Sequence, residues 1–184
     1  AGLPTAHEKN IKWLEHATRI KNYATVTNFS ATELKYPDNF FDAIITDPPY
    51  YDNAPYSYLS DFFYVWLKRA IGHLHPEIFL TSETPKTKEI VVYTQNQSWD
   101  EAKIKFETML KKSFREINRV LKENGIAVIV YAHKTTEGWE TVINALLDSG
   151  LNVTASWPIS TEMVGRKLRL SKANCKKAVI QNNL

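Results

Sequence analysis

The chain has 184 residues, of which 43% are hydrophobic and 12% aromatic, so it is too apolar for a disordered protein and suits one domain, residues 1–184, with a sizeable core. Its single cysteine, Cys175, excludes an intrachain disulfide and a cysteine-rich zinc site, so we expect no metal and a reducing, cytoplasmic compartment. The apolar runs are much shorter than the roughly 20 residues of a membrane span, and no signal-peptide pattern is present, so we expect a soluble protein.

The charge is small overall but unevenly distributed. The formal net charge is +3, yet Glu162 is the last acidic residue. Six basic residues follow it: Arg166, Lys167, Arg169, Lys172, Lys176 and Lys177. A basic segment of this kind fits a polyanion partner, and an ordinary solvated loop explains it equally well.

The first third of the chain predicts one helix and two strands. Residues 5–8 have capping-box spacing, and apolar residues recur at helical intervals up to Ile20, so we expect a helix over 6–21 that packs by one face. Residues 23–28 read as a short strand. The apolar residues 41–46 predict a second, buried strand that carries Asp47 at its carboxyl end.

The middle of the chain predicts a helix followed by an irregular insertion. Five apolar residues follow the spacing of one broad helical face: Leu59, Phe62, Phe63, Trp66 and Leu67. We interpret this stripe as core and not as a surface that stacks bases. Residues 70–97 show no period, and a connection of this length in a compact domain is usually functional or disordered, so we predict an insertion.

The remainder alternates helices and strands. A second capping box at 98–101 and an apolar stripe predict a long helix that stops at Gly125, and residues 126–132 predict a strand covered on both faces. Five residues that share one face predict the next helix, which ends before Gly150: Trp139, Val142, Ile143, Leu146 and Leu147. Residues 151–160 read as a half-exposed strand, with a final antiparallel strand over 177–181 beside it.

This order of elements predicts the fold class. Strands that alternate with helices favour an open α/β sheet, mostly parallel, with an antiparallel last strand. In such sheets ligands bind outside the carboxyl ends of the strands. We therefore expect Asp47, His133 and Glu162 to lie along one edge of the sheet.

The stretch "AIITDPPYYDN" at residues 43–53 carries the chemistry. Proline fixes its own φ, lacks an N–H and holds the preceding residue extended, so Asp47-Pro48-Pro49 forms a stiff ledge. The ledge presents acceptors, the Asp47 carboxylate and the Pro48 carbonyl, followed by the aromatic ring of Tyr50. Such a ledge suits a planar donor such as the exocyclic amino group of a nucleobase.

The two acceptors would also activate that amino group. Its lone pair is delocalised into the ring, and two N–H hydrogen bonds draw the nitrogen toward tetrahedral geometry, so that the lone pair points at an electrophilic methyl group. Holding the two reacting atoms about 3 to 3.5 Å apart supplies much of the rate through orientation. An ordinary proline-rich turn is the alternative, but the position of the ledge, at the end of a buried strand, favours function.

Here the sequence resembles a known family. "DPPY" after an apolar strand is the catalytic motif of S-adenosylmethionine-dependent amino-methyltransferases, the group that contains adenine-N6 and cytosine-N4 DNA methylases. The string "TDPPYYDNAPYSYLSDFFYVWLKR", residues 46–69, is similar to the large candidate adenine-specific DNA methylases of archaea and bacteria. The resemblance extends through "SFREINRVLKENGIAVIVYAHK" and "GWETVINALLDSGLNVTASWPISTEM", and so covers most of residues 24–163.

The resemblance implies a Rossmann-like class I methyltransferase sheet, in which residues 41–46 form the fourth strand and 126–132 the fifth. It also implies S-adenosylmethionine as cofactor and DNA, with the target base flipped from the duplex, as partner. Asp47, Pro48, Pro49 and Tyr50 take the catalytic and base-stacking roles.

Further site residues follow from position. The candidates for binding the cofactor are Asn28, Phe29, Ser30 and Asp47. The first three fall where the family meets the adenine of the cofactor, although the family often has an acid near there and this chain has Ser30. Candidates for the base and the phosphate are Tyr51, Asp52, Asn53, Tyr56, His133 and Lys134.

The family's glycine-rich loop has no counterpart here. The six glycines form no F-x-G-x-G motif, and strands one and two of the family sheet are not recognisable. We therefore expect the chain to be the carboxyl-terminal catalytic part of a longer protein, or half of a split enzyme, whose missing part holds the cofactor.

Three functions remain open at this point. Transfer of a methyl group to adenine N6 of DNA is favoured by the string match, and cytosine N4 requires the same chemistry. An RNA base amino-methyltransferase of the guanine-N2 type carries related motifs. A fragment without catalytic activity that binds nucleic acid through its basic segment is the third.

Overall fold

In a computed structural model of the chain, residues 5–19, 24–50, 55–92, 98–133, 135–159 and 176–182 are described. The elements in chain order are α1 (Ala6–Ala17), β1 (Phe41–Thr46), α2 (Tyr56–Ile71), α3 (Trp99–Val120), β2 (Leu121–His133), α4 (Thr136–Leu147), β3 (Ala155–Ile159) and β4 (Lys176–Asn182). No helix within the described ranges combines the length and the apolar character that crossing a membrane requires.

The strands form one sheet in the order β1-β2-β4-β3. β1 and β2 are parallel, with Ile44 opposite Ala127, while β4 is antiparallel to both of its neighbours. β1, β2 and β3 therefore run one way and β4 the other. This confirms the predicted α/β sheet, mostly parallel with an antiparallel last strand.

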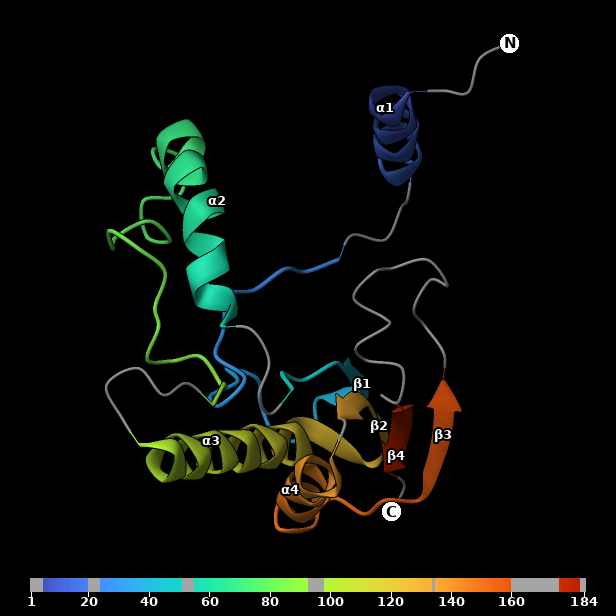
Figure 1. The fold of residues 1–184 in the computed structure, drawn as a ribbon. Helices are drawn as coiled ribbons and strands as arrows, with labels where there is room; N and C mark the ends of the chain where they lie inside the picture. The colour runs from blue at the N-terminus through green and yellow to red at the C-terminus, as the bar shows by residue number, and fades with distance from the viewer. Residues whose placement is uncertain are drawn as a thin grey trace.

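The core lies between this sheet and two helices. α3 and α4 cover the same face of the sheet (Figure 1). The largest fully buried side chains of this layer come from α3, β2 and α4: Phe106, Leu110, Phe114, Ile129, Tyr131, Val142 and Leu146. Burying an aliphatic or aromatic side chain of this size stabilises the fold by about 1.5–3 kcal/mol. The long stripe predicted on α3 is thus core.

α3 ends five residues before the predicted stop at Gly125. Leu121 is already extended, with φ −81° and ψ 137°, and pairs with Phe41. The carbonyls of Arg119 and Val120 accept hydrogen bonds from the N–H groups of residues 39 and 40, which lead into β1. Because the incoming strand satisfies the last carbonyls of the helix, a glycine cap is not required.

Neither prediction for the amino-terminal region is fully met. α1 has its capping box, as expected, but ends at Ala17, and the exposed fraction of Trp13 is 71%, so the predicted packing by one face is wrong. Residues 24–28 form no strand, because no strand of the described sheet lies beside them to pair with their backbone. Tyr23, the first residue of the predicted strand, lies outside the described residues.

Among the described elements, the two helices that cover the sheet both lie on one face. Ile45 of β1 is 76% exposed and Ile126 of β2 is also exposed, whereas their neighbours Ile44 and Ala127 face the core. The prediction of a buried first strand is therefore wrong. The second strand is covered on both faces only in part, because Ile126 is exposed and Val128 and Val130 are half-buried, while Ala132 is buried. The reason is that α3 and α4 both lie on the other face.

α2 exposes the stripe that was predicted to be core. The five side chains of that stripe are all exposed, Phe62 by 66%, and the buried residues Ser57 and Tyr64 lie on the opposite side of the helix. Residues 72–92, which contain no helix or strand, cover that opposite side (Figure 1). Residues 72–92 are irregular, as expected, whereas Ala70 and Ile71 belong to α2 and 93–97 lie outside the described residues. That this segment is an insertion stays a prediction.

The carboxyl-terminal elements agree with prediction in kind and differ in extent. Val142 and Leu146 of α4 are buried, but Ile143 and Leu147 are exposed, so the predicted apolar face is only partly core. β3 covers residues 155–159 of the predicted 151–160. β4 pairs with β3 as predicted.

Candidate active site

The predicted ledge lies at the carboxyl end of β1. Thr46, the last residue of β1, pairs with Ile129 of β2, and Asp47 follows at the edge of the sheet. Pro48 is buried, while the Asp47 side chain is exposed. The position predicted for Asp47, beside the strand of residues 126–132, is confirmed.

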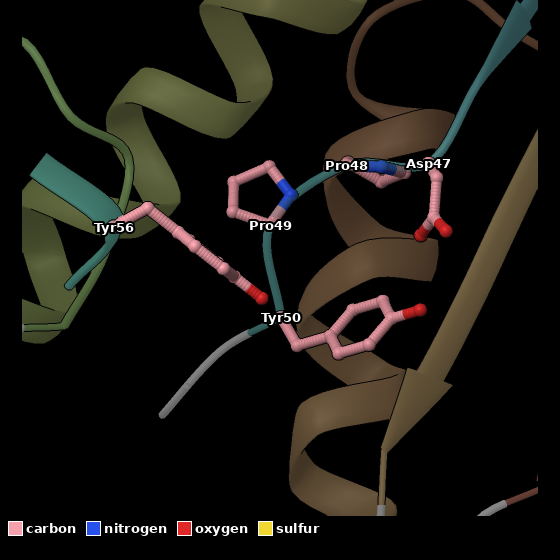
Figure 2. Close-up of a pocket in the computed structure, with 5 residues that line it drawn as sticks. All are labelled: Asp47, Pro48, Pro49, Tyr50 and Tyr56. Atoms are coloured by element: carbon pink, nitrogen blue, oxygen red, sulfur yellow. The ribbon is translucent and has the colours of Figure 1, made fainter. Parts of the chain in front are cut away.

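An open pocket of about 340 Å³ lies over this ledge. Its lining residues are Asp47, Pro48, Pro49, Tyr50 and Tyr56. Figure 2 shows Tyr56 reaching from the start of α2 toward Pro49 and Tyr50, while the Asp47 carboxylate lies beyond the prolines. The volume is at the lower end of the roughly 300–1,000 Å³ of small-molecule pockets.

The ring of Tyr50 is held from behind by the core. It meets the ring of Tyr131 edge to face, with centroids 5.5 Å apart and planes at 88°. Tyr131 is fully buried, makes a similar contact with Trp139, and donates a hydrogen bond from its hydroxyl to the Gly138 carbonyl over 3.2 Å. The sequence analysis did not identify Tyr131 as a support of the pocket. Its signal was a polar hydroxyl on an aromatic ring within an otherwise aliphatic strand.

The Asp47 carboxylate is available to a ligand. Among the described residues, none donates a hydrogen bond to it or forms an ion pair with it. Asp42, at the other end of β1, instead pairs with Lys122 over 2.6 Å, which lowers the pKa of Asp42 through that hydrogen bond. The two aspartates of one strand thus differ in their surroundings.

His133 lies at the same edge of the sheet but not in the pocket lining. It is buried at the end of β2, its ring stacks with Tyr131 at 9° between planes, and its Nδ1 accepts a hydrogen bond from the Thr135 N–H over 3.1 Å. The structure thus packs His133 against the start of α4. Its predicted contact with substrate stays a prediction.

The predicted cofactor residues lie elsewhere in the structure. Phe29 contacts Tyr36, which packs on Phe40 and Phe41 at the amino end of β1. Asp47 is at the carboxyl end, roughly 20 Å away along a six-residue strand. Asn28 and Ser30 belong to the same exposed stretch. The structure does not bring these residues together with Asp47, and their role stays a prediction.

Several predicted residues fall outside the described ranges: Tyr51, Asp52, Asn53, Lys134 and Glu162. The same holds for most of the basic segment that follows Glu162, of which only the backbone of Lys176 and Lys177 in β4 is described. Within the described ranges, no cluster of three or more histidine, cysteine or acidic side chains has the arrangement of a metal site.

The chain resembles several solved structures weakly. It matches TTHA0409, a candidate DNA modification methylase of Thermus thermophilus, with 15% identity and a TM-score of 0.40 over 84% of this chain and 52% of that protein. The structure of TTHA0409 in complex with S-adenosyl-L-methionine matches with 15% identity and a TM-score of 0.39, with the same coverage of both chains. The [4+2]-cyclase SpnF matches with 14% identity and a TM-score of 0.42 over 95% of this chain and 60% of SpnF.

The chain therefore spans about half the length of the Thermus protein. No family model matches the chain, and no curated protein does. Because the TM-scores are low, these likenesses do not identify its function.

Proposed function

We propose that the chain is the base-binding, catalytic part of a methyltransferase that moves a methyl group from S-adenosylmethionine to the exocyclic amino group of a DNA base, with adenine N6 as the target. One observation carries the proposal: the Asp47-Pro48-Pro49-Tyr50 ledge ends a strand at the sheet edge and lines an open pocket whose other wall is Tyr56.

The acceptors of the ledge match the amino group. The Asp47 carboxylate accepts one N–H and the Pro48 carbonyl the other, so the nitrogen is held with its lone pair free. Pro49 has no N–H and therefore does not compete as a donor. The Asp47 carboxylate has no partner among the described residues, so it needs no rearrangement before it accepts this hydrogen bond.

The aromatic residues of the pocket suit the base. Tyr50 is half-buried against Tyr131. A base swung out of the duplex would stack on the Tyr50 ring, in the space between the Asp47-Pro48-Pro49 ledge and Tyr56. Because Tyr50 is already ordered by Tyr131, stacking costs little side-chain entropy. The resemblance of residues 46–69 to adenine-specific methylases favours adenine over cytosine.

The described residues fit the base better than the cofactor. Residues 28–30 are at the far end of β1, and the sequence has no glycine-rich loop, so we propose that residues outside this sequence hold the methionine end. The cofactor, when bound, would supply an electrophilic sulfonium methyl group. The Asp47 carboxylate and the Pro48 carbonyl would hold the accepting nitrogen, whose gain of the methyl group would leave a neutral thioether and release one amino proton to solvent.

The test is methyl transfer from labelled S-adenosylmethionine to DNA by the protein as it is expressed from its own gene. Asp47→Ala removes one acceptor of the amino group, so we expect transition-state stabilisation to fall by on the order of 3 kcal/mol, with cofactor binding retained. Asp42→Ala is the matched control, because it removes a carboxylate from the same strand at the opposite end, and should keep near-normal turnover.

Tyr50 provides the second arm. Tyr50→Ala should weaken productive base binding by about 1–3 kcal/mol, the usual contribution of one base–aromatic stack, and Tyr50→Phe should be milder since the ring remains. Mass spectrometry of the product identifies the methylated base. Normal turnover of Asp47→Ala, or methylation confined to structured RNA, would contradict the assignment to DNA.

A further inference from the structure

Tyr56, one wall of the pocket, takes its position from helix α2. It is the first residue of α2, which stands away from the sheet (Figure 1). Among the described elements, α2 packs extensively against neither the sheet nor the other helices. The position of Tyr56 relative to Tyr50 must therefore be set by other contacts.

Residues 72–92, called here the brace segment, supply those contacts at the start of α2. The helix follows Pro55, which gives no side-chain cap, and its first turn has no acidic residue. The Glu89 carboxylate takes both roles: it accepts hydrogen bonds from the Ser57 N–H over 3.2 Å and from the Ser57 hydroxyl over 2.5 Å. An acceptor with negative charge at this end satisfies a free N–H and complements the helix dipole.

A second set of bonds fixes the next turns of α2. The Asp61 carboxylate accepts hydrogen bonds from the Thr84 N–H over 2.9 Å and from the Lys86 ammonium over 2.6 Å. One turn further along, the Tyr64 hydroxyl donates to the Thr81 carbonyl over 2.8 Å. The brace segment therefore follows one side of the helix, and the helix cannot rotate without breaking these bonds.

The brace segment is in turn anchored in the core directly beside Glu89. Val91 and Val92 are buried, and Ile90 and Val92 contact the core cluster that contains Tyr131. The same cluster supports Tyr50. Core packing thus fixes the backbone next to Glu89, and Glu89 holds the start of α2. Tyr50 and Tyr56, the two aromatic walls of the pocket, are therefore both positioned by the same core cluster.

We propose that Glu89 is a positioning residue of the base pocket: by capping α2 from the brace segment, it holds Tyr56 at the distance from Tyr50 that admits a flipped base. This assigns a purpose to the irregular brace segment, and it rests on the proposed function. Glu89 itself does not line the pocket and touches no reacting atom.

The test compares variants of the protein as it is expressed from its own gene. Glu89→Ala should raise KM for DNA by roughly 2- to 30-fold, the equivalent of losing a helix N-cap, and leave kcat nearly unchanged. Glu89→Gln keeps one acceptor for the Ser57 N–H and should recover most of the loss. Glu83→Ala is the matched control, because Glu83 belongs to the same segment and its largely exposed side chain lies 3.6 Å from Lys86. The Glu83 carbonyl, which accepts a hydrogen bond from the Thr81 hydroxyl, is kept in this variant.

Amide hydrogen exchange gives a readout that does not depend on activity. The amides of the first turn of α2 should exchange faster in Glu89→Ala than in Glu83→Ala, while the amides of β2 stay protected. If Glu89→Ala folds poorly, Ser57→Ala removes the hydroxyl contact alone and should give the same pattern in smaller degree.

The outcomes separate the two proposals. Unchanged exchange in the first turn, or a loss confined to kcat, would overturn the role of Glu89. A normal KM in Tyr56→Ala would also overturn it, because Tyr56 would then not contact the base. Faster exchange in Glu89→Ala, together with normal turnover of Asp47→Ala, would support Glu89 as the cap of α2 and would reject the proposed function instead.

Discussion

At the scale of single residues, the contact between α4 and the end of β2 depends on the absence of one side chain. A Cβ at Gly138 would lie 2.1 Å from Nδ1 of His133, far inside any allowed contact. The carbonyl of Gly138 accepts the Tyr131 hydroxyl, and Tyr131 supports Tyr50. Position 138 is therefore linked by direct contacts to the aromatic wall of the pocket.

Gly138→Ala should lower the free energy of unfolding by about 1–3 kcal/mol, because an added methyl group in a packed site forces the His133 ring or the helix to move. Urea denaturation measures the change. Asn144→Ala, an exposed position in the same helix, is the control and should change stability by no more than about 0.5 kcal/mol. Equal unfolding free energies of the two variants would mean that the His133 ring moves away from the added methyl group without loss of stability.

At the scale of elements, the attachment of α2 to the brace segment depends on pH. Hydrogen bonds from Lys86 and then Thr84 lower the pKa of Asp61 to about 2. The usual pKa of an aspartate in an unfolded chain is about 3.9. Because the folded pKa is depressed, the contribution of Asp61 to stability is complete above about pH 4 and is lost as the pH falls toward 2.

The difference in unfolding free energy between the native protein and Asp61→Asn should therefore be constant at neutral pH and shrink as the pH is lowered from about 4 to 2. Chemical denaturation at a series of pH values gives this difference. Glu83→Gln serves as the control, since Glu83 is largely exposed and lies 3.6 Å from Lys86. A difference that stays constant down to pH 2 would show that Asp61 is not stabilised as a carboxylate.

At the scale of the whole molecule, the described sheet has helices on one face only. The exposed side chains Ile45, Ile126 and Trp157 belong to the other face or its rim, and the stripe on α2 is also exposed. In the part of the chain that is described, the pocket is lined by one carboxylate, two prolines and two tyrosine rings, and no glycine-rich loop lines it.

The isolated chain of 184 residues should therefore bind S-adenosylmethionine weakly or not at all. The sequence lacks the glycine-rich loop that would let its backbone approach the methionine end, and residues 28–30 lie at the opposite end of β1 from Asp47. Titration calorimetry is the measurement. Micromolar affinity would show that the described residues already contain the cofactor site.

The sequence by itself determined the local elements and the place of the ledge. Capping boxes at residues 5 and 98 marked two helix starts correctly, and the apolar run before Asp47 predicted β1 to the residue. These signals are local, because a cap, a turn and a periodic stripe each depend on residues close in sequence. The same holds for the acceptors of Asp47 and Pro48, which follow from two adjacent prolines.

Only the tertiary structure decided which apolar surfaces are covered and which side chains meet. The stripe on α2 has the spacing of a core helix yet is exposed, because periodicity shows that a face is apolar and not what packs against it. The contacts of Glu89 with Ser57 and of Tyr50 with Tyr131 join residues 32 or more positions apart, so no local pattern reveals them. The pocket depends on both contacts, and its shape is therefore a property of the folded chain.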